Sequence, residues 1–340
     1  MKDKLLYFPY INVPYNAWVV RNLIYWDEIG AIVPRDYINE PNRLEREMRE
    51  MVSAQLIRQV IPDNYIYRNE NRVANAFIEL IKKYKIPERT KNSKFGAEYS
   101  SKIHVDKFGY QIIEFLKENN LAKQIDYPWY IIETVTANLF MAYLAAYLAN
   151  EDDLDMTPMT DAAAKLAVFA EDYPIGALRE LSYLENMRLE LLNDFFPMPS
   201  TTIRINEIIS FKERYGEFSK NFRQELESKI KEISFIESKE ERSWKLNELK
   251  RTSADKIKEL ESRMKERNWG KILFGTLCGL GSAAIPGVRA IVTHDISGAI
   301  EAVPGLLGAI YSVYEGRSDK QKAIIESPLA YASYVKKTFK

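Results

Sequence analysis

Residues 5–33 read LLYFPYINVPYNAWVVRNLIYWDEIGAIV, and this stretch decides how the N-terminal part of the chain folds. The apolar, aromatic run over 5–10 predicts a first strand. Asn16 can cap a helix from Ala17 to about Asp27, and Gly30 is expected to end that helix. The apolar run over 31–33 predicts a second strand. Because two strands joined by a helix in one sheet run parallel, we expect a small strand-helix-strand unit here.

Apolar residues at helical spacing dominate the sequence after Pro41. The spacing predicts helices over residues 42–60, 71–84, 106–119, 128–150 and 175–193. The helix over 128–150 is nearly free of charge, so we expect it at the centre of the N-terminal core. Mixed α/β character is therefore expected only at the N-terminal end, and the predicted fold class is mainly α (α+β).

Phe196-Pro197-Met198-Pro199 is the clearest break in the pattern and predicts a domain boundary. The expected domains are 1–196, mixed but mostly helical, and 197–340, built of long charged helices and a glycine-rich apolar hairpin. No glycine or proline occurs between Glu217 and Trp269. That segment is either one long helix or a hairpin that turns within 238–241. We favour the hairpin, because a single helix of this length would leave its apolar stripe uncovered.

The segment 270–316 holds nine of the fourteen glycines and is mostly apolar. Its two halves are close to the lower limit of about 17 residues for crossing a bilayer. Gly275 and Gly279 would let two helices approach closely, and Pro286 and Pro304 interrupt the halves. We favour a hairpin packed on the preceding helices. A hairpin that inserts into a membrane on activation and an oligomer interface are the alternatives.

Composition excludes several classes of protein. Lys and Arg number 48, as do Asp and Glu, so no net charge attracts nucleic acid. A single cysteine allows no internal disulfide, and we find no signal peptide, so we expect a cytoplasmic protein. Two histidines and one cysteine argue against a zinc site. We predict no cofactor and no metal.

Two groups of residues are weak catalytic candidates. Asp63 with Glu79 and Lys82 is similar to the acid-acid-lysine set of metal-dependent nucleases, although Glu79 and Lys82 fall on a predicted helix rather than a strand. A surface pair of charges explains the same spacing. If His104 and Asp106 are extended, their side chains share a face and can share a metal or a proton. A histidine beside a helix cap is the simpler interpretation.

A third group consists of acidic residues near the first two predicted strands. Trp26-Asp27-Glu28 and Asp36 would cluster carboxylates at the carboxyl edge of the small sheet, where ligand sites of α/β proteins form. Helix capping and surface solvation explain these residues equally well.

Several stretches resemble a bacterial and phage family known as domain of unknown function 6236. The resemblance covers most of the first 235 residues, and it includes LYFPYI at 6–11, LIYWDEI at 23–29, IHVDK at 103–107, MAYLA at 141–145 and IISFK at 208–212. It implies a prokaryotic origin and, by association, a role in defence against phage. Because the family has no established activity, no residue inherits a role from it.

The leading functional hypothesis is a non-enzymatic protein that self-associates or docks a protein partner through its charged helices. The first alternative is an effector that inserts 272–314 into membrane lipid at the inner face of the membrane. The second is a metal-dependent nuclease that uses the N-terminal carboxylates.

Overall fold

The computed structural model describes residues 2–83, 100–161, 176–196, 203–265 and 327–339. It divides into two compact units, Met1–Ser219 with Phe339 and Lys220–Thr338 with Lys340. The division falls inside the helix α11 (Ile205–Ser234). The boundary predicted after residue 196 adjoins 197–202, which lie outside the described residues. The mainly helical α+β class predicted from the sequence is confirmed.

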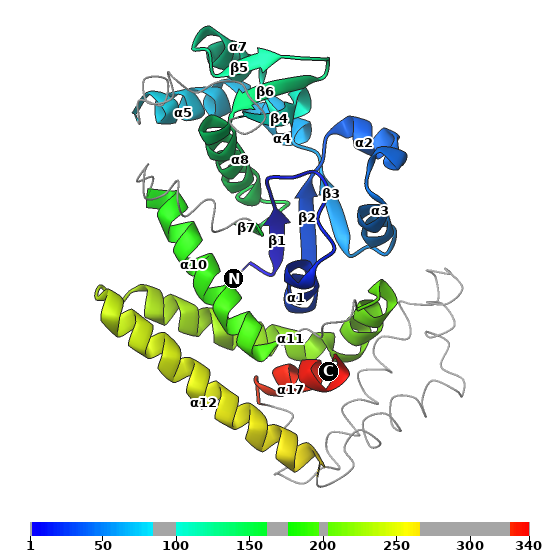
Figure 1. Ribbon diagram of the computed structural model, residues 1–340, viewed down its shortest axis with the longest axis vertical. Coiled ribbons are helices and arrows are strands. Elements are labelled where there is room, and N and C mark those ends of the chain that lie inside the picture. The colour runs from blue at the N-terminus through cyan, green and yellow to red at the C-terminus, as the bar shows by residue number, and fades with distance from the viewer. Residues whose placement is uncertain (1, 84–99, 162–175, 197–202, 266–326, 340) are drawn as a thin grey trace. The chain divides into compact units, whose positions relative to one another are not determined.

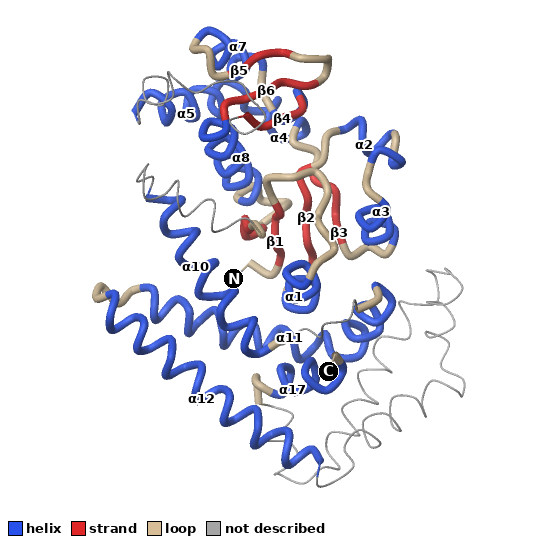
Figure 2. Tube along the Cα trace, in the orientation of Figure 1, coloured by secondary structure: helices blue, strands red, loops and turns tan. Residues whose placement is uncertain are grey.

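A four-stranded parallel sheet forms the centre of the first unit (Figures 1 and 2). Its strand order is β3-β2-β1-β7, with β1 (Lys4–Tyr7), β2 (Glu28–Ile32), β3 (Ile57–Val60) and β7 (Met156–Met159). The predicted parallel pairing of β1 and β2 is confirmed. Leu5, Leu6 and Tyr7 are fully buried, as expected for a strand between two parallel neighbours.

The helix α1 (Ala17–Tyr25) begins as predicted, because the Asn16 side chain accepts a hydrogen bond from the Val19 N–H at 3.0 Å. It ends earlier than expected, and the role assigned to Gly30 is wrong. Gly30 lies within β2, where a Cβ would stand 2.7 Å from the sulfur of Met156. The glycine therefore makes room for a side chain from β7 rather than ending a helix.

The expected helix over 42–60 is also wrong. The chain forms the 3₁₀ helix η1 (Pro41–Arg43) and the helix α3 (Arg46–Ser53), and then enters β3. Gln55 has a φ of 57°, a left-handed conformation that ends the helical course. Apolar spacing alone did not separate this short helix from the strand that follows it.

The expected helix over 128–150 divides in the same way, into the strand β6 (Trp129–Glu133) and the helix α8 (Thr134–Ala149). The Glu133 carboxylate accepts hydrogen bonds from the Val135 and Thr136 N–H groups at 3.0 and 2.8 Å, so a new helix starts there. β6 pairs antiparallel with β4 (Ser100–His104) and β5 (Ala122–Gln124). Mixed character therefore extends beyond the N-terminal end.

One hydrophobic cluster joins both sheets to the helices α5 (Glu70–Lys83), α7 (Tyr110–Glu118) and α8. Leu6 of the parallel sheet and Ile132 of the antiparallel sheet belong to it, and the rings of Phe108 and Phe140 stack with centroids 4.3 Å apart. α8 occupies the core as predicted. This shared core holds the antiparallel sheet in one body with the parallel strands.

Three further helical predictions have mixed outcomes. α5 agrees with the helix predicted over 71–84, and α10 (Gly176–Phe195) agrees with the one predicted over 175–193. α7 starts later than the helix predicted over 106–119, at Tyr110 with Gly109 as its N-cap. At the end of α1, Lys212 of α11 donates hydrogen bonds to three backbone carbonyl oxygens at 2.8–3.1 Å. A cation at this position offsets the negative end of the helix dipole.

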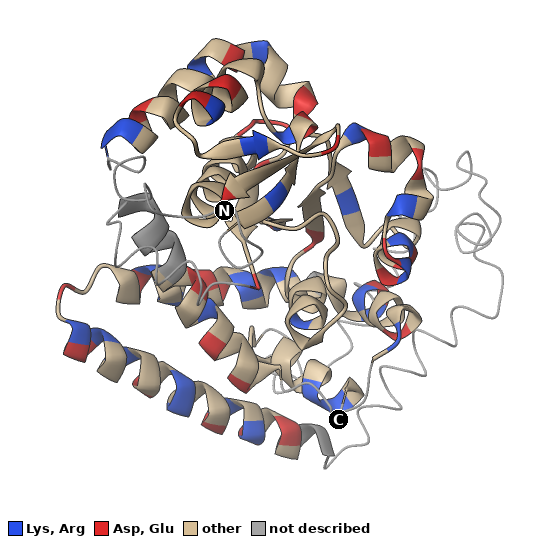
Figure 3. Cartoon of the chain, turned by 45° about the horizontal axis from the view of Figure 1, so that its top comes forward, with Lys and Arg blue, Asp and Glu red and all other residues tan. Residues whose placement is uncertain are grey.

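The second unit contains the rest of α11, the helix α12 (Lys239–Lys265) and the helix α17 (Ala330–Thr338). A break over 235–238 separates α11 from α12, so two helices replace a single long one, as favoured from the sequence. The turn lies earlier than the predicted 238–241, because residues 239–241 already belong to α12. Basic and acidic side chains are interspersed along α12 (Figure 3).

The glycine-rich segment with Gly275, Gly279, Pro286 and Pro304 lies outside the described residues. Among the described helices, none combines the length and the apolar character that a bilayer crossing requires.

Replacing Glu133 with alanine should lower the free energy of unfolding by about 1–2 kcal/mol, because α8 loses its N-cap. The side chain is only 6% exposed, so water cannot fully replace the lost acceptors. Urea denaturation followed by circular dichroism measures the change. The exposed Glu118→Ala variant is the control and should change stability by less than about 0.5 kcal/mol. Equal stability of the two variants would contradict the assigned role.

Candidate functional site

The carboxyl ends of the four parallel strands lie along one edge of the sheet, where ligand sites of α/β proteins form. β2 and β7 lie on opposite sides of β1, so the strand order reverses at β1. A cavity of about 580 Å³ opens at this edge. Its walls come from the β1–α1 loop, from α2 (Arg35–Asn39), from β4 and β6, and from the 3₁₀ helix η3 (Val105–Lys107). Asp161, two residues after the end of β7, also lines it. Strand ends that are distant in the sequence thus contribute to one site.

Lys107 is the most unusual wall residue. Its side chain is 3% exposed, and its ammonium group donates one hydrogen bond, to the Pro9 carbonyl oxygen at 3.3 Å. Among the described residues, no carboxylate oxygen lies within 4 Å of this nitrogen. Burial alone lowers the pKa of Lys107 to about 7. The cavity therefore contains a buried amine that has no counter-charge within 4 Å among the described residues.

His104, the last residue of β4, is 1% exposed and also faces the cavity. Its Nδ1 accepts a hydrogen bond from the Asp106 N–H at 3.2 Å. In a neutral ring the proton therefore sits on Nε2, which has no hydrogen-bond partner and lies 3.7 Å from a carboxylate oxygen of Asp36. Burial lowers the pKa of His104, while the Asp106 and Asp36 carboxylates act in the opposite direction. The neutral ring is favoured near pH 7.

Aromatic side chains form another part of the wall. The Trp129 ring stands edge-on to His104 at 5.0 Å between centroids, and the Lys102 ammonium lies 4.8 Å from the centre of the same indole. Tyr37 contributes a second ring, and Tyr10 is 51% exposed beside the opening. These rings offer flat apolar surfaces next to two lysine amines.

One acidic group of the cavity is engaged within the fold. The Tyr7 hydroxyl donates to an Asp161 carboxylate oxygen at 3.0 Å, which joins the end of β1 to the residue after Thr160. Burial, and then the Asp161 charge, raises the pKa of Tyr7 above its ordinary range. Tyr7 therefore stays protonated, and its hydrogen bond holds Asp161 at the wall of the cavity.

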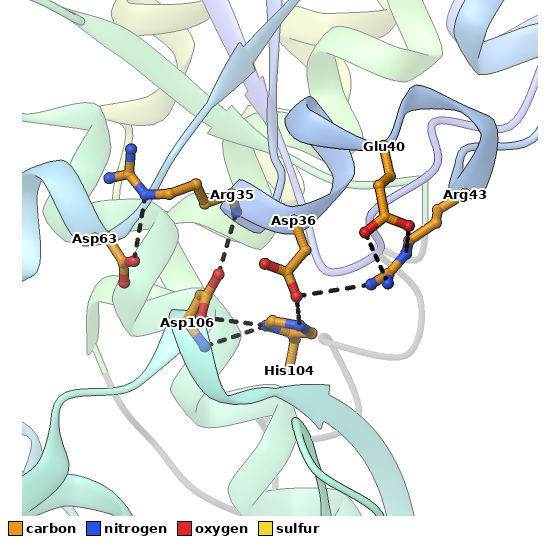
Figure 4. A network of polar contacts seen from close by, with 7 residues as sticks. All are labelled: Arg35, Asp36, Glu40, Arg43, Asp63, His104 and Asp106. Carbon is orange, nitrogen blue, oxygen red and sulfur yellow. Dashed lines mark hydrogen bonds and ion pairs between the residues drawn. The ribbon is translucent and has the colours of Figure 1, made fainter.

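A network of charged residues lies beside the cavity (Figure 4). Asp36 and Asp63 follow β2 and β3, and Asp106 follows β4. The Arg35 N–H donates to an Asp106 carboxylate oxygen at 3.2 Å, and the Arg35 guanidinium lies 4.0 Å from Asp63. Because Asp106 precedes Lys107, its contact with Arg35 ties η3 to the start of α2 and so helps to position the buried amine.

The predicted Asp63–Glu79–Lys82 set is not brought together. Glu79 and Lys82 are exposed on α5, and the Lys82 ammonium lies over the Phe115 ring at 5.6 Å. Asp63 instead pairs with Arg35, at 4.0 Å between Nε and a carboxylate oxygen. Among the described residues, no three or more His, Cys, Asp or Glu side chains are grouped so that they could hold a metal ion. The nuclease hypothesis gains no support from this arrangement.

The other sequence candidates fare differently. The structure does bring His104 and Asp106 together, with Nδ1 3.7 Å from a carboxylate oxygen, although Asp106 lies in η3 rather than in a strand. Asp36 lies at the carboxyl edge as expected. Glu28 begins β2 and therefore lies with Asp27 at the amino edge, so the predicted four-residue cluster is wrong.

Sequence reasoning missed Lys107, Lys102, Trp129, Tyr37 and Asp161. These residues lie within two residues of a strand end or shortly beyond one, and that position is the signal that could have identified them. That signal was hidden, because β4, β6 and β7 were not predicted as strands.

No family model, no curated protein and no solved structure matches this chain. The resemblance to domain of unknown function 6236 therefore stays a prediction, and the geometry of the site carries the functional argument alone.

Asp63 gives the network a measurable pH dependence. Burial first, and the Asp106 charge second, raise its pKa from 3.8 to about 6, against the opposing effect of Arg35. Between those two pH values the folded state binds more protons than the unfolded state, so this residue lowers stability as pH rises through the window. Asp63→Asn should therefore raise the free energy of unfolding at pH 7 by about 1–2 kcal/mol.

The gain in stability should disappear near pH 4, because Asp63 is then protonated in the folded protein and is as neutral as the asparagine that replaces it. Urea denaturation at the two pH values measures it. The control is Glu79→Gln, an exposed carboxylate on α5, which should change stability by less than about 0.5 kcal/mol at either pH. A destabilised Asp63→Asn protein at pH 7 would show that the ion pair with Arg35 outweighs burial.

Proposed function

We propose that the cavity at the carboxyl edge binds a small organic anion and that the first unit is a ligand-binding module. The observation that carries the proposal is Lys107, a buried amine in the cavity wall that has no carboxylate partner among the described residues. Burying an unpaired charge costs several kcal/mol, about 3 or more, so proteins pair buried charges or neutralise them. A bound anion supplies the missing partner.

Two neighbours support this choice of ligand. Lys102 provides a second amine at the wall, and the Nε2–H of His104 is a buried donor without a hydrogen-bond partner. A buried donor that stays unsatisfied costs about 1–3 kcal/mol, so a ligand oxygen that accepts from it gains affinity. Lys102, His104 and Lys107 all line this one cavity, and the two lysine amines favour an acidic group over a basic one.

The rest of the cavity indicates the shape of the ligand. Its volume of about 580 Å³ suits a molecule of metabolite size. The rings of Trp129 and Tyr37 favour a ligand with a flat or apolar part, since such surfaces gain free energy when both leave water. The acidic residues Asp161 and Glu45 at the wall would restrict the position of the anionic group to the side of the lysines.

The proposal is tested with 4-deoxypyridoxine 5′-phosphate, a flat-ring anion without a carbonyl group. The full chain should bind it saturably in isothermal titration calorimetry at pH 7, and Lys107→Met should lower the affinity at least about tenfold. Lys82→Met, an exposed lysine of α5, is the matched control and should bind as the unchanged protein does.

The affinity should also fall as pH rises above 7, because the Lys107 amine then loses its proton and a bound anion loses its counter-charge. Binding of equal affinity in Lys107→Met, or no binding of the probe at any pH from 6 to 8, would count against the proposal.

Self-association or docking through the charged helices of the second unit stays a prediction, as does the cytoplasmic location. Phe235 and Trp244 lie beside the turn between α11 and α12 and are 74% and 59% exposed, as contact with a second copy would require. Sedimentation velocity of the full chain at micromolar concentration tests self-association, and a strict monomer would exclude it at that concentration.

A further inference from the structure

We propose that Lys107 forms an imine with the carbonyl carbon of an anionic carbonyl compound bound in the carboxyl-edge cavity. The inference rests on the anion site proposed above and names the ligand class of that site. It assigns Lys107 a covalent role in addition to an electrostatic one.

The geometry around Lys107 is that of a nucleophilic amine. A lysine that forms an imine must lie in a cavity, be largely free of water and lack a carboxylate that would hold its proton. Lys107 lines the cavity and is 3% exposed, and among the described residues its ammonium donates only to the Pro9 carbonyl oxygen. A single contact of 3.3 Å with a neutral carbonyl leaves the nitrogen able to turn toward a ligand.

The surroundings favour the neutral amine. The other ionisable groups of the cavity wall are Lys102 and His104 of β4, the acids Glu45 and Asp161, and the phenols of Tyr10 and Tyr37. Neither acid pairs with Lys107, and burial lowers the pKa of its amine to about 7. A substantial fraction of the amine is therefore unprotonated at neutral pH, whereas a lysine in water is almost fully protonated there.

The reaction balances without an oxidant or reductant. The nitrogen lone pair of the neutral Lys107 amine forms a bond to the carbonyl carbon, and the first of the two amine protons passes through water to the carbonyl oxygen, which gives a carbinolamine. The oxygen then leaves as water when the nitrogen gives up its second proton and the C=N bond forms.

Two other groups would hold the ligand during these steps. Lys102, fixed over the Trp129 indole, offers an ammonium for the anionic group of the compound. The rings of Trp129 and Tyr37 offer surfaces for its carbon skeleton. Before the imine forms, the Lys107 ammonium pairs with the anionic group; in the imine, Lys102 holds that group while Lys107 is bonded to the carbonyl carbon.

Pyridoxal 5′-phosphate serves as the probe, because it combines a flat ring, a phosphate and an aldehyde. The full chain is mixed with one equivalent at pH 7, the imine is reduced with borohydride, and the modified lysine is located by peptide mass spectrometry. We expect at least about tenfold more adduct at Lys107 than at any other lysine, because exposed amines are protonated at this pH. Lys107→Arg should lose that adduct, and Lys82→Arg should keep it.

A pH series on the unchanged protein tests the inference even if the Lys107→Arg variant fails to fold. The yield of adduct at Lys107 should reach about half of its maximum by pH 7. The yield at exposed lysines should rise only at much higher pH. Adducts spread over surface lysines, with Lys107 unmodified across the series, would overturn the inference.

The probe without an aldehyde separates the two proposals. If 4-deoxypyridoxine 5′-phosphate binds in a Lys107-dependent manner while the aldehyde gives no Lys107 adduct, the imine is excluded and the anion site stands. If the aldehyde modifies Lys107 selectively but the other probe does not bind, the imine stands and the anion site is excluded.

Discussion

The parallel pairing of β1 with β2 on one side and β7 on the other is the constraint on which the first unit depends. The register joins Leu5 to Ile29 and to Thr157, so residues more than a hundred positions apart share one sheet. Parallel strands require crossover connections, and here the connection before β7 contains the antiparallel sheet and most of the core helices. The same pairing therefore assembles both the core and the edge at which the cavity lies.

Charge is distributed unevenly at that edge. The carboxylates Asp36, Asp63 and Asp106 are held near arginines, whereas the cavity beside them contains the amines of Lys102 and Lys107. Asp106 connects the two regions, because it contacts Arg35 and directly precedes Lys107. The acidic network thus positions a basic site without neutralising it. A protein that needed Lys107 only for stability would gain more from pairing it with one of these carboxylates.

Some expectations failed because the chain changes from strand to helix within a few residues. At 128–150 the apolar residues continue through β6 into α8, and periodicity alone does not locate the change. The Glu133 carboxylate marks it, since it caps the new helix in place of the Asp or Asn that a cap search expects. Gly30 shows the opposite error, because a residue expected to end a helix instead accommodates Met156 from a distant strand. The contact with Met156 is not visible in local sequence, because the two residues are more than a hundred positions apart.

The sequence by itself determined the mainly helical class, the capped helix α1, the parallel strands beside it, the position of Asp36 and the turn that separates α11 from α12. These features depend on local spacing, capping and chain breaks, which are properties of neighbouring residues. Only the tertiary structure decided that Lys107, His104, Trp129 and Asp161 line one cavity. These side chains come together only through strand pairings across most of the first unit. Water is excluded from Lys107 only once those strands are assembled.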